Sequence, residues 1–173
     1  TTKQIMEVAT RIIKNDDVES EDEDNDYVAP SANQIREGKK VRRLMRPSFE
    51  DAYIDAAKKA ARLWESCKDS DERIVIAAQG LNAREKMAEC LSAQGVPTKL
   101  CEKEELVSPG NKIPITTLHQ LKGLEFDHVI IADLGDNSMP QYWASKSPLE
   151  KPEEADHYLR RLVYVAMTRA RKE

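Results

Sequence analysis

The segment Ile115-Thr-Thr-Leu-His-Gln-Leu-Lys-Gly-Leu-Glu-Phe-Asp-His-Val-Ile-Ile131 decides the fold of this chain. It joins two short apolar runs, 113–118 and 127–132, through a polar stretch. Short apolar runs without polar alternation are typical of strands that are buried on both faces. Residues 73–78 form a third run of this kind, and 97–101 are typical of another short strand. The four runs together predict a buried sheet of mostly parallel strands.

Helices are predicted between these strands by apolar residues at helical spacing. The clearest stripe covers 49–67, with Ser48 as its expected N-cap, and a second stripe covers 2–14. Asn82 predicts the cap of a third helix, and a last helix is expected from 152 to about 170. Because buried strands alternate with amphipathic helices, the sequence predicts an α/β three-layer domain. Ligands of such sheets gather beyond the carboxyl ends of the strands.

The composition excludes several classes of protein. Hydrophobic residues make up 40% of the 173 residues, with 6 Gly and 8 Pro, which excludes collagen-like and Pro/Gly-rich chains. No apolar run is long enough for a membrane span, and no apolar leader is present, so we expect a cytoplasmic protein without a membrane partner. The 3 cysteines lack CxxC spacing, which predicts free thiols and no metal site.

The net charge of −4 conceals two segments of opposite sign. Residues 16–26 hold eight acidic side chains and no basic one, so we expect a solvated, disordered loop over about 16–30. Residues 36–46 are strongly basic, and within them Val41 to Met45 predicts a short strand. Without the acidic segment 16–26, the rest of the chain would carry a small net positive charge.

Polar residues that suit phosphate and sugar contacts crowd the stretch from Thr117 to Glu125. It follows a buried strand and includes His119, Lys122 and Gly123. A glycine lets an anion approach the backbone closely, whereas a single His or Lys is usually only a solvated side chain. The stretch is therefore a candidate ligand-binding loop.

Arginines stand at both ends of the otherwise apolar segment 158–172, which covers most of the last expected helix. Arg169, near its end, has two interpretations. Its guanidinium could stabilise charge on a transferring phosphoryl group, or it could simply favour the negative end of the helix dipole. The spacing of the arginines alone leaves both open.

Two long patterns in these segments carry a family resemblance. Thr117 to Phe126 matches T-x-H-x-x-K-G-L-E-F, and Arg160 to Ala170 matches R-R-L-x-Y-V-A-x-T-R-A. They resemble motifs V and VI of superfamily 1 helicases of the UvrD/Rep type. The opening residues 1–5 are similar to the end of motif IV of that family. The resemblance implies that residues 1–173 form a single domain, the second of the two RecA-like domains of such a helicase, with a P-loop NTPase-type fold. It also implies that the protein belongs to the shorter branch of the family, which lacks the large inserted subdomain.

The resemblance also implies roles in nucleotide binding. Arg169 corresponds to the arginine finger, the catalytic residue that reaches the γ-phosphate of ATP. Lys122 and Gly123 lie where motif V lines the nucleotide cleft, and Glu125 matches the position near the ribose. All four are thereby expected at an ATP site.

Further residues are assigned by the same comparison. Arg160, Arg161 and Tyr164 are expected to support the ATP-binding, interdomain face. Thr117 and His119 match positions that face the backbone of single-stranded DNA.

No G-x-x-x-x-G-K-[ST] phosphate loop occurs in the 173 residues. The resemblance therefore implies that ATP and Mg²⁺ are held mainly by an N-terminal RecA-like domain of the same polypeptide. The isolated chain is expected to hydrolyse no ATP. Two alternatives remain to a helicase or translocase half. One is the ATPase module of a nuclease-helicase or of an RNA-polymerase-associated remodeller, and the other is a non-catalytic interaction domain of the same fold.

Overall fold

A single parallel sheet forms the centre of the molecule in the computed structural model. The structure describes residues 1–14, 36–67, 69–107, 111–134 and 152–173, without side-chain detail at 14 and 152–155. The sheet has the strand order β2-β3-β1-β4, and every pair of neighbours is parallel. Its strands are β1 (Ile74–Ala77), β2 (Thr98–Leu100), β3 (Ile113–Thr116) and β4 (His128–Ile131). All four predicted strands are confirmed.

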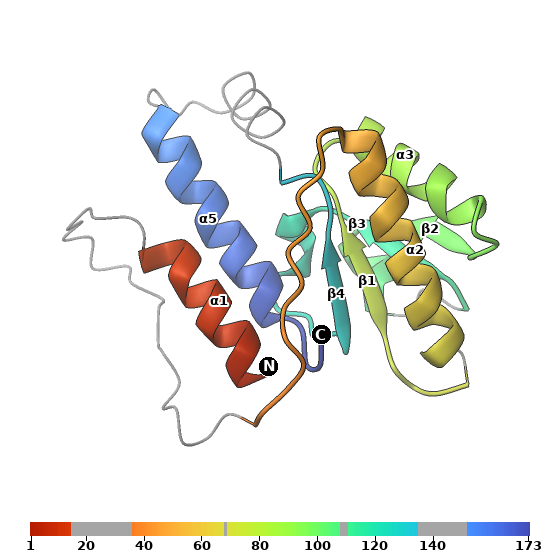
Figure 1. Ribbon diagram of the computed structural model, residues 1–173, viewed down its shortest axis with the longest axis horizontal. Coiled ribbons are helices and arrows are strands. Elements are labelled where there is room, and N and C mark those ends of the chain that lie inside the picture. The colour runs from red at the N-terminus through yellow and green to blue at the C-terminus, as the bar shows by residue number, and fades with distance from the viewer. Residues whose placement is uncertain (15–35, 68, 108–110, 135–151) are drawn as a thin grey trace.

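Helices cover both faces of this sheet (Figure 1). On one face lie α2 (Phe49–Cys67) and α3 (Leu81–Ser92), and on the other lie α1 (Lys3–Lys14) and α5 (Pro152–Thr168). Alternate residues of β1 serve the two layers, because Ile76 packs in the α2 core and Val75 in the α5 core. The predicted α/β three-layer class is therefore confirmed.

The two predicted helix caps have different outcomes. The Oγ of Ser48 accepts a hydrogen bond from the backbone N–H of Asp51 at 3.1 Å, so the first predicted cap is confirmed. The second prediction is wrong, because α3 begins at Leu81 and Asn82 lies inside its first turn. Gly80 occupies the N-cap position instead of Asn82. Its φ of 74° is a backbone conformation that favours glycine.

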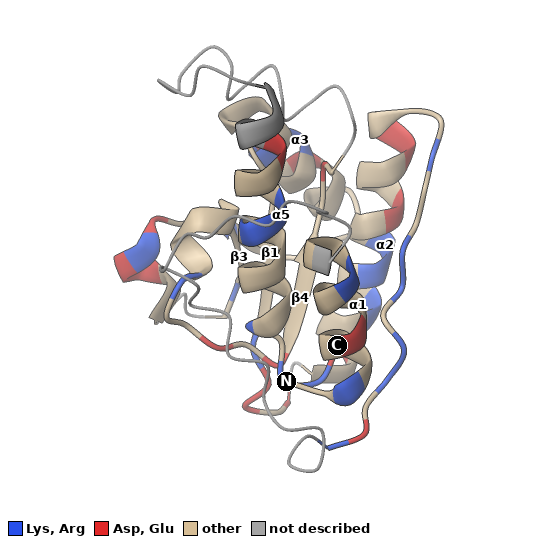
Figure 2. Cartoon of the chain, turned by 90° about the vertical axis from the view of Figure 1, so that its left-hand side faces the viewer, with Lys and Arg blue, Asp and Glu red and all other residues tan. Residues whose placement is uncertain are grey.

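The basic segment 36–46 is extended but is no strand of the sheet. It runs from the end of the molecule that holds both termini to the start of α2, and Lys and Arg residues recur along it (Figures 1 and 2). The strand predicted over Val41 to Met45 is wrong, because the side chains of 42–45 are exposed on both sides and none of the described strands pairs with them. The acidic segment 16–30 lies outside the described residues.

Among the described helices, none combines the length and the apolar character that a membrane span requires.

Candidate functional site

The candidate loop 117–126 runs from the carboxyl ends of the strands to their amino ends. We call these two sides of the sheet the carboxyl edge and the amino edge. Strand β3 ends at Thr116 and β4 begins at His128, and because the two are parallel the connection must return to the amino edge. It does so through the short 3₁₀ helix η3 (Leu118–Leu121). Leu118 and Leu121 are buried beneath α5. The loop is thus fixed in the core at its middle, with polar residues at each end.

At the carboxyl edge the loop presents Thr117 and His119. Both side chains are half-buried. The Nε2 of His119 lies 3.1 Å from the hydroxyl of Tyr158 on α5, and the two rings are 5.8 Å apart between centroids. Burial lowers the pKa of His119 below its ordinary value of 6.5. His119 is therefore neutral at pH 7, able to form a hydrogen bond but carrying no charge.

At the amino edge, opposite to the carboxyl ends where ligands of this sheet class were expected, the loop presents Lys122, Gly123 and Glu125, and all three are exposed. Gly123 has a φ of 83°, and no atom lies within 4 Å of the place where a Cβ would stand. The glycine is therefore required by backbone conformation and not by crowding. The backbone at this point is open to an incoming ligand.

The end of α5 pairs with the same end of the loop. The N–H of Phe126 donates to the carbonyl of Arg169 at 3.0 Å, and the N–H of Arg171 donates back to Phe126 at 2.8 Å. This parallel bridge joins Phe126 to Ala170. The Phe126 ring is fully buried, with the guanidinium of Arg73 4.6 Å from its centroid. The ends of the two sequence motifs are thus held together by backbone hydrogen bonds.

The guanidinium of Arg169 lies against the end of its own helix. Its Nε donates to the carbonyl of Val165 at 3.2 Å, and its Nη2 contacts the hydroxyl of Thr168 at 3.3 Å. These contacts engage two of the five N–H donors that a guanidinium carries. The side chain is half-buried, and its geometry is compatible with both interpretations drawn from the sequence.

A third segment, the start of α1, completes this end of the molecule. The hydroxyl of the buried Thr2 accepts a hydrogen bond from Ile5 at 3.4 Å in the first turn of the helix. The charged side chains of Glu125 and of three arginines, at positions 36, 169 and 171, all lie near the backbone nitrogen of Thr1. The three segments that resemble motifs IV, V and VI therefore meet at one place.

Arg36 belongs to this group although the sequence analysis did not single it out. Its Nη2 donates to the carbonyl of Arg171 at 2.6 Å, and its own carbonyl accepts from Lys3 at 3.0 Å. We call Arg36, Arg169 and Arg171 the three-arginine cluster. The strong positive charge of 36–46 was the only signal in the sequence that could have pointed to Arg36.

The other arginines expected at the ATP site lie further along α5. Arg160 is about 13 Å from Arg169 along the helix axis, at 1.5 Å per residue. Its Nε donates to Asp156 at 2.7 Å, and its Nη1 donates to the carbonyl of Ile12 at the far end of α1 at 3.4 Å. Arg161 is exposed and Tyr164 is half-buried. The structure does not bring these three to Arg169, and their ATP role stays a prediction.

Residues 102–173 match the family model described as the UvrD-like helicase C-terminal domain. This match supports a UvrD-like C-terminal domain. The matched UvrD-like region contains both long motifs and the paired backbone of Phe126 and Ala170. The resemblance read from the sequence is therefore confirmed.

Curated helicases are similar to part of this chain. The ATP-dependent DNA helicase UvrD1 of Mycobacterium tuberculosis is 37% identical over 86 residues, which cover 45% of this chain and 10% of that protein. The ATP-dependent DNA helicase Rep of Buchnera aphidicola is 40% identical over 65 residues, which cover 38% of this chain and 9% of that protein. The chain thus spans about a tenth of the length of these relatives.

A solved structure shares the fold. The C-terminal domain of a possible DNA helicase from Lactobacillus plantarum WCFS1 aligns with a TM-score of 0.62 and 21% identity, covering 100% of this chain and 82% of that one. At this identity the match shows the fold alone.

Proposed function

We propose that residues 1–173 form a single domain, the second RecA-like motor domain of an ATP-dependent DNA helicase or translocase. In this proposal the chain supplies one side of an ATP site, and an N-terminal phosphate-loop domain of the same polypeptide supplies the other and holds Mg²⁺. One observation carries the proposal. The backbone bridge between Phe126 and Ala170 fixes Glu125 and Arg169 side by side, next to the start of α1.

The residues at this end of the molecule fit an anionic ligand. The three-arginine cluster concentrates positive charge, and Gly123 leaves the backbone open beside it. A triphosphate bound on the partner domain would supply the phosphoryl group that is transferred. Arg169 would then direct its remaining N–H donors at the charge that develops on that group. Its hydrogen bond to Val165 holds the side chain in place meanwhile.

The opposite edge of the loop is proposed to contact single-stranded DNA. Thr117 offers a hydroxyl, and His119 offers a neutral imidazole at pH 7. Contacts of these kinds with a sugar-phosphate backbone carry no information on base sequence. The basic segment 36–46 adds positive charge, so the grip should be non-specific and sensitive to salt. Action on DNA and the free cysteines both favour the cytoplasm as the place where the protein works.

The isolated chain provides the first test of the shared ATP site. Purified 1–173 should show no steady ATP turnover, with or without single-stranded DNA, because it lacks a phosphate loop. Joining it to its N-terminal phosphate-loop domain should create DNA-stimulated turnover. The proposal would be contradicted if 1–173 alone hydrolysed ATP steadily and if this activity disappeared in Arg169→Ala. Strand-displacement assays on the joined protein would separate a helicase from an ATPase module that does not unwind DNA.

A further inference from the structure

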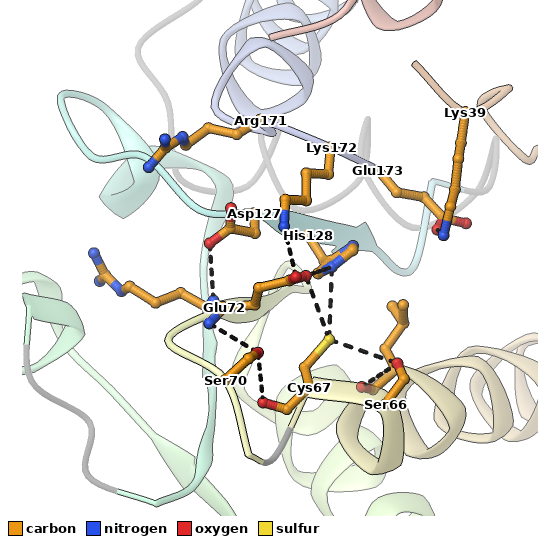
Figure 3. Close-up of polar contacts among 12 residues, drawn as sticks. Lys39, Ser66, Cys67, Ser70, Glu72, Asp127, His128, Arg171, Lys172 and Glu173 are labelled. Carbon is orange, nitrogen blue, oxygen red and sulfur yellow. Dashed lines mark hydrogen bonds and ion pairs between the residues drawn. The ribbon is translucent and has the colours of Figure 1, made fainter.

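A Cys, a Glu and a His converge at the amino edge of the sheet, outside the site described above. Cys67 is the last residue of α2, Glu72 precedes β1, and His128 opens β4. The Sγ of Cys67 lies 3.7 Å from Nε2 of His128 and 3.5 Å from Oε2 of Glu72. The same Nε2 and Oε2 atoms are 2.8 Å apart (Figure 3). We call these residues the Cys-Glu-His cluster.

We propose that the Cys-Glu-His cluster binds a divalent transition-metal ion of the zinc class. Tetrahedral Zn²⁺ with ordinary bond lengths separates a sulfur from a nitrogen or oxygen ligand by about 3.5 Å, and a nitrogen from an oxygen by about 3.3 Å. Both distances to sulfur already match, and only the His128–Glu72 contact has to open slightly. Thiolate, imidazole and carboxylate are the ligand types that zinc takes in proteins.

The burial of the ligands supports a built site. His128 is 3% exposed and Cys67 is 6% exposed, whereas the side chain of Glu72 is 30% exposed. The Nδ1 of His128 has no partner among the described residues, so the ring is oriented through Nε2, the atom that faces Cys67 and Glu72. A buried ring held by one nitrogen in this way presents that nitrogen to the centre of the cluster.

The surroundings of Glu72 leave one carboxylate oxygen for the metal. Its Oε1 is 2.5 Å from the ammonium of Lys172, whereas Oε2 faces the cluster. Lys172 would therefore orient the carboxylate from outside while Oε2 binds the ion. A cavity of about 310 Å³ is lined by Cys67, Glu72 and Trp64 among others, which gives an ion and a fourth, water ligand access from solvent.

Binding would tie the end of α2 to the first residue of β4. The Cys67 thiol gives its proton to solvent as the metal–sulfur bond forms, and the His128 proton resides on Nδ1. Thiolate and carboxylate together balance the two charges of the ion. We assign the ion a structural role, because none of its three ligands belongs to the loop residues Thr117 to Glu125.

The experiment uses the purified metal-free chain 1–173 and Co²⁺ as a spectroscopic probe. Co²⁺ should bind with one equivalent, produce a thiolate-to-metal charge-transfer band, and be displaced by Zn²⁺. Zn²⁺ should raise the melting temperature, since it binds the folded chain. Cys67→Ser should abolish the band and weaken Zn²⁺ binding by more than about 100-fold, beyond the effect of losing an outer partner. Cys90→Ser and Cys101→Ser are matched controls that should retain both.

Two outcomes would overturn the proposal. One is the absence of a charge-transfer band in a folded chain. The other is Zn²⁺ binding of equal affinity in Cys67→Ser, as expected if the acidic run 16–26 merely collects cations through carboxylates. Glu72→Gln is a second variant, at a partly exposed position. It should keep the circular dichroism spectrum of the parent and weaken Zn²⁺ binding at least tenfold.

Discussion

The two ends of the loop 117–126 are held in different ways. At the carboxyl edge His119 contacts Tyr158 through side chains alone. At the amino edge Phe126 is fixed by backbone hydrogen bonds to Arg169 and Arg171. The first contact is made by α5 and the second by the residues that directly follow it, at points about 16 Å apart along the helix axis, at 1.5 Å per residue. A movement of α5 would therefore reach both ends, which in our proposal face DNA and ATP respectively.

The largest expected effect concerns the amino edge and uses the protein that joins this chain to its phosphate-loop domain. Arg169→Ala should lower DNA-stimulated ATP turnover by about 10³–10⁵-fold, because the guanidinium stabilises transition-state charge. Arg169→Lys should rescue little, since it lacks the planar fork. Steady-state turnover and single-strand affinity should be measured together, and the affinity should stay nearly unchanged.

The alternative role of Arg169 predicts a different pattern. If its bond to Val165 only caps α5, Arg169→Ala should cost about 0.3–1 kcal/mol of stability and leave turnover intact. Arg62→Ala is the control, an exposed arginine on α2 that has no assigned role. Near-normal turnover in Arg169→Ala, equal to that of the control, would remove Arg169 from the catalytic residues.

The second prediction concerns the anchor of the amino edge. Phe126→Ala removes a fully buried ring and its contact with Arg73, so the free energy of unfolding of 1–173 should fall by about 3–5 kcal/mol. Urea denaturation measures this loss. Phe49→Ala is the control, because Phe49 is 42% exposed and should cost under about 1 kcal/mol. Equal losses in the two variants would show that Phe126 does not anchor the loop.

The third prediction concerns the carboxyl edge. Thr117→Val and His119→Gln should each weaken binding of 1–173 to single-stranded oligonucleotides by about five- to tenfold, the value of one hydrogen bond. Fluorescence anisotropy measures the affinity, which should fall steeply with salt and be equal for unrelated base sequences. Unchanged affinity in both variants, or a strong sequence preference that resists salt, would contradict the proposed DNA contact.

The protonation of His119 predicts how stability and single-strand affinity should change with pH. Its pKa is lowered by burial, so the stability contributed by the neutral ring is present above pH 6.5 and is lost as the pH falls through the folded-state pKa. Protonation also adds a positive charge near DNA. Single-strand affinity should therefore rise below pH 6.5 while stability falls, and His119→Gln should reduce both slopes.

The sequence predicted most of the fold because the relevant signals are local. The strands are continuous apolar runs, and the cap of α2 lies within four residues. The predicted strand over Val41 to Met45 and the predicted cap at Asn82 were wrong because both were based on local sequence alone, without the tertiary contacts that such elements need. In one case no strand was available to pair, and in the other Gly80 had taken the cap position.

The sites were predictable only in part. The motif patterns named Glu125 and Arg169, but only the fold shows that their backbones pair and that Arg36 joins them. The Cys-Glu-His cluster had no sequence signal at all. Cys67 and His128 are 61 positions apart, so no local spacing relates them, and the parallel sheet brings them together.

The smallest expected effect concerns Gly123, at the open part of the amino edge. Gly123→Ala should destabilise 1–173 by about 1 kcal/mol, because a φ of 83° is unfavourable for alanine although the added methyl group meets no neighbour. Gly95→Ala is a close control, since Gly95 has a φ of 72° and equally open surroundings, in the turn before β2. Urea denaturation should give similar losses for both. In the joined protein only Gly123→Ala should also lower ATP turnover, because the methyl group stands where the ligand approaches the backbone. Equal turnover in the two variants would mean that Gly123 serves the turn alone and that the ligand does not approach there.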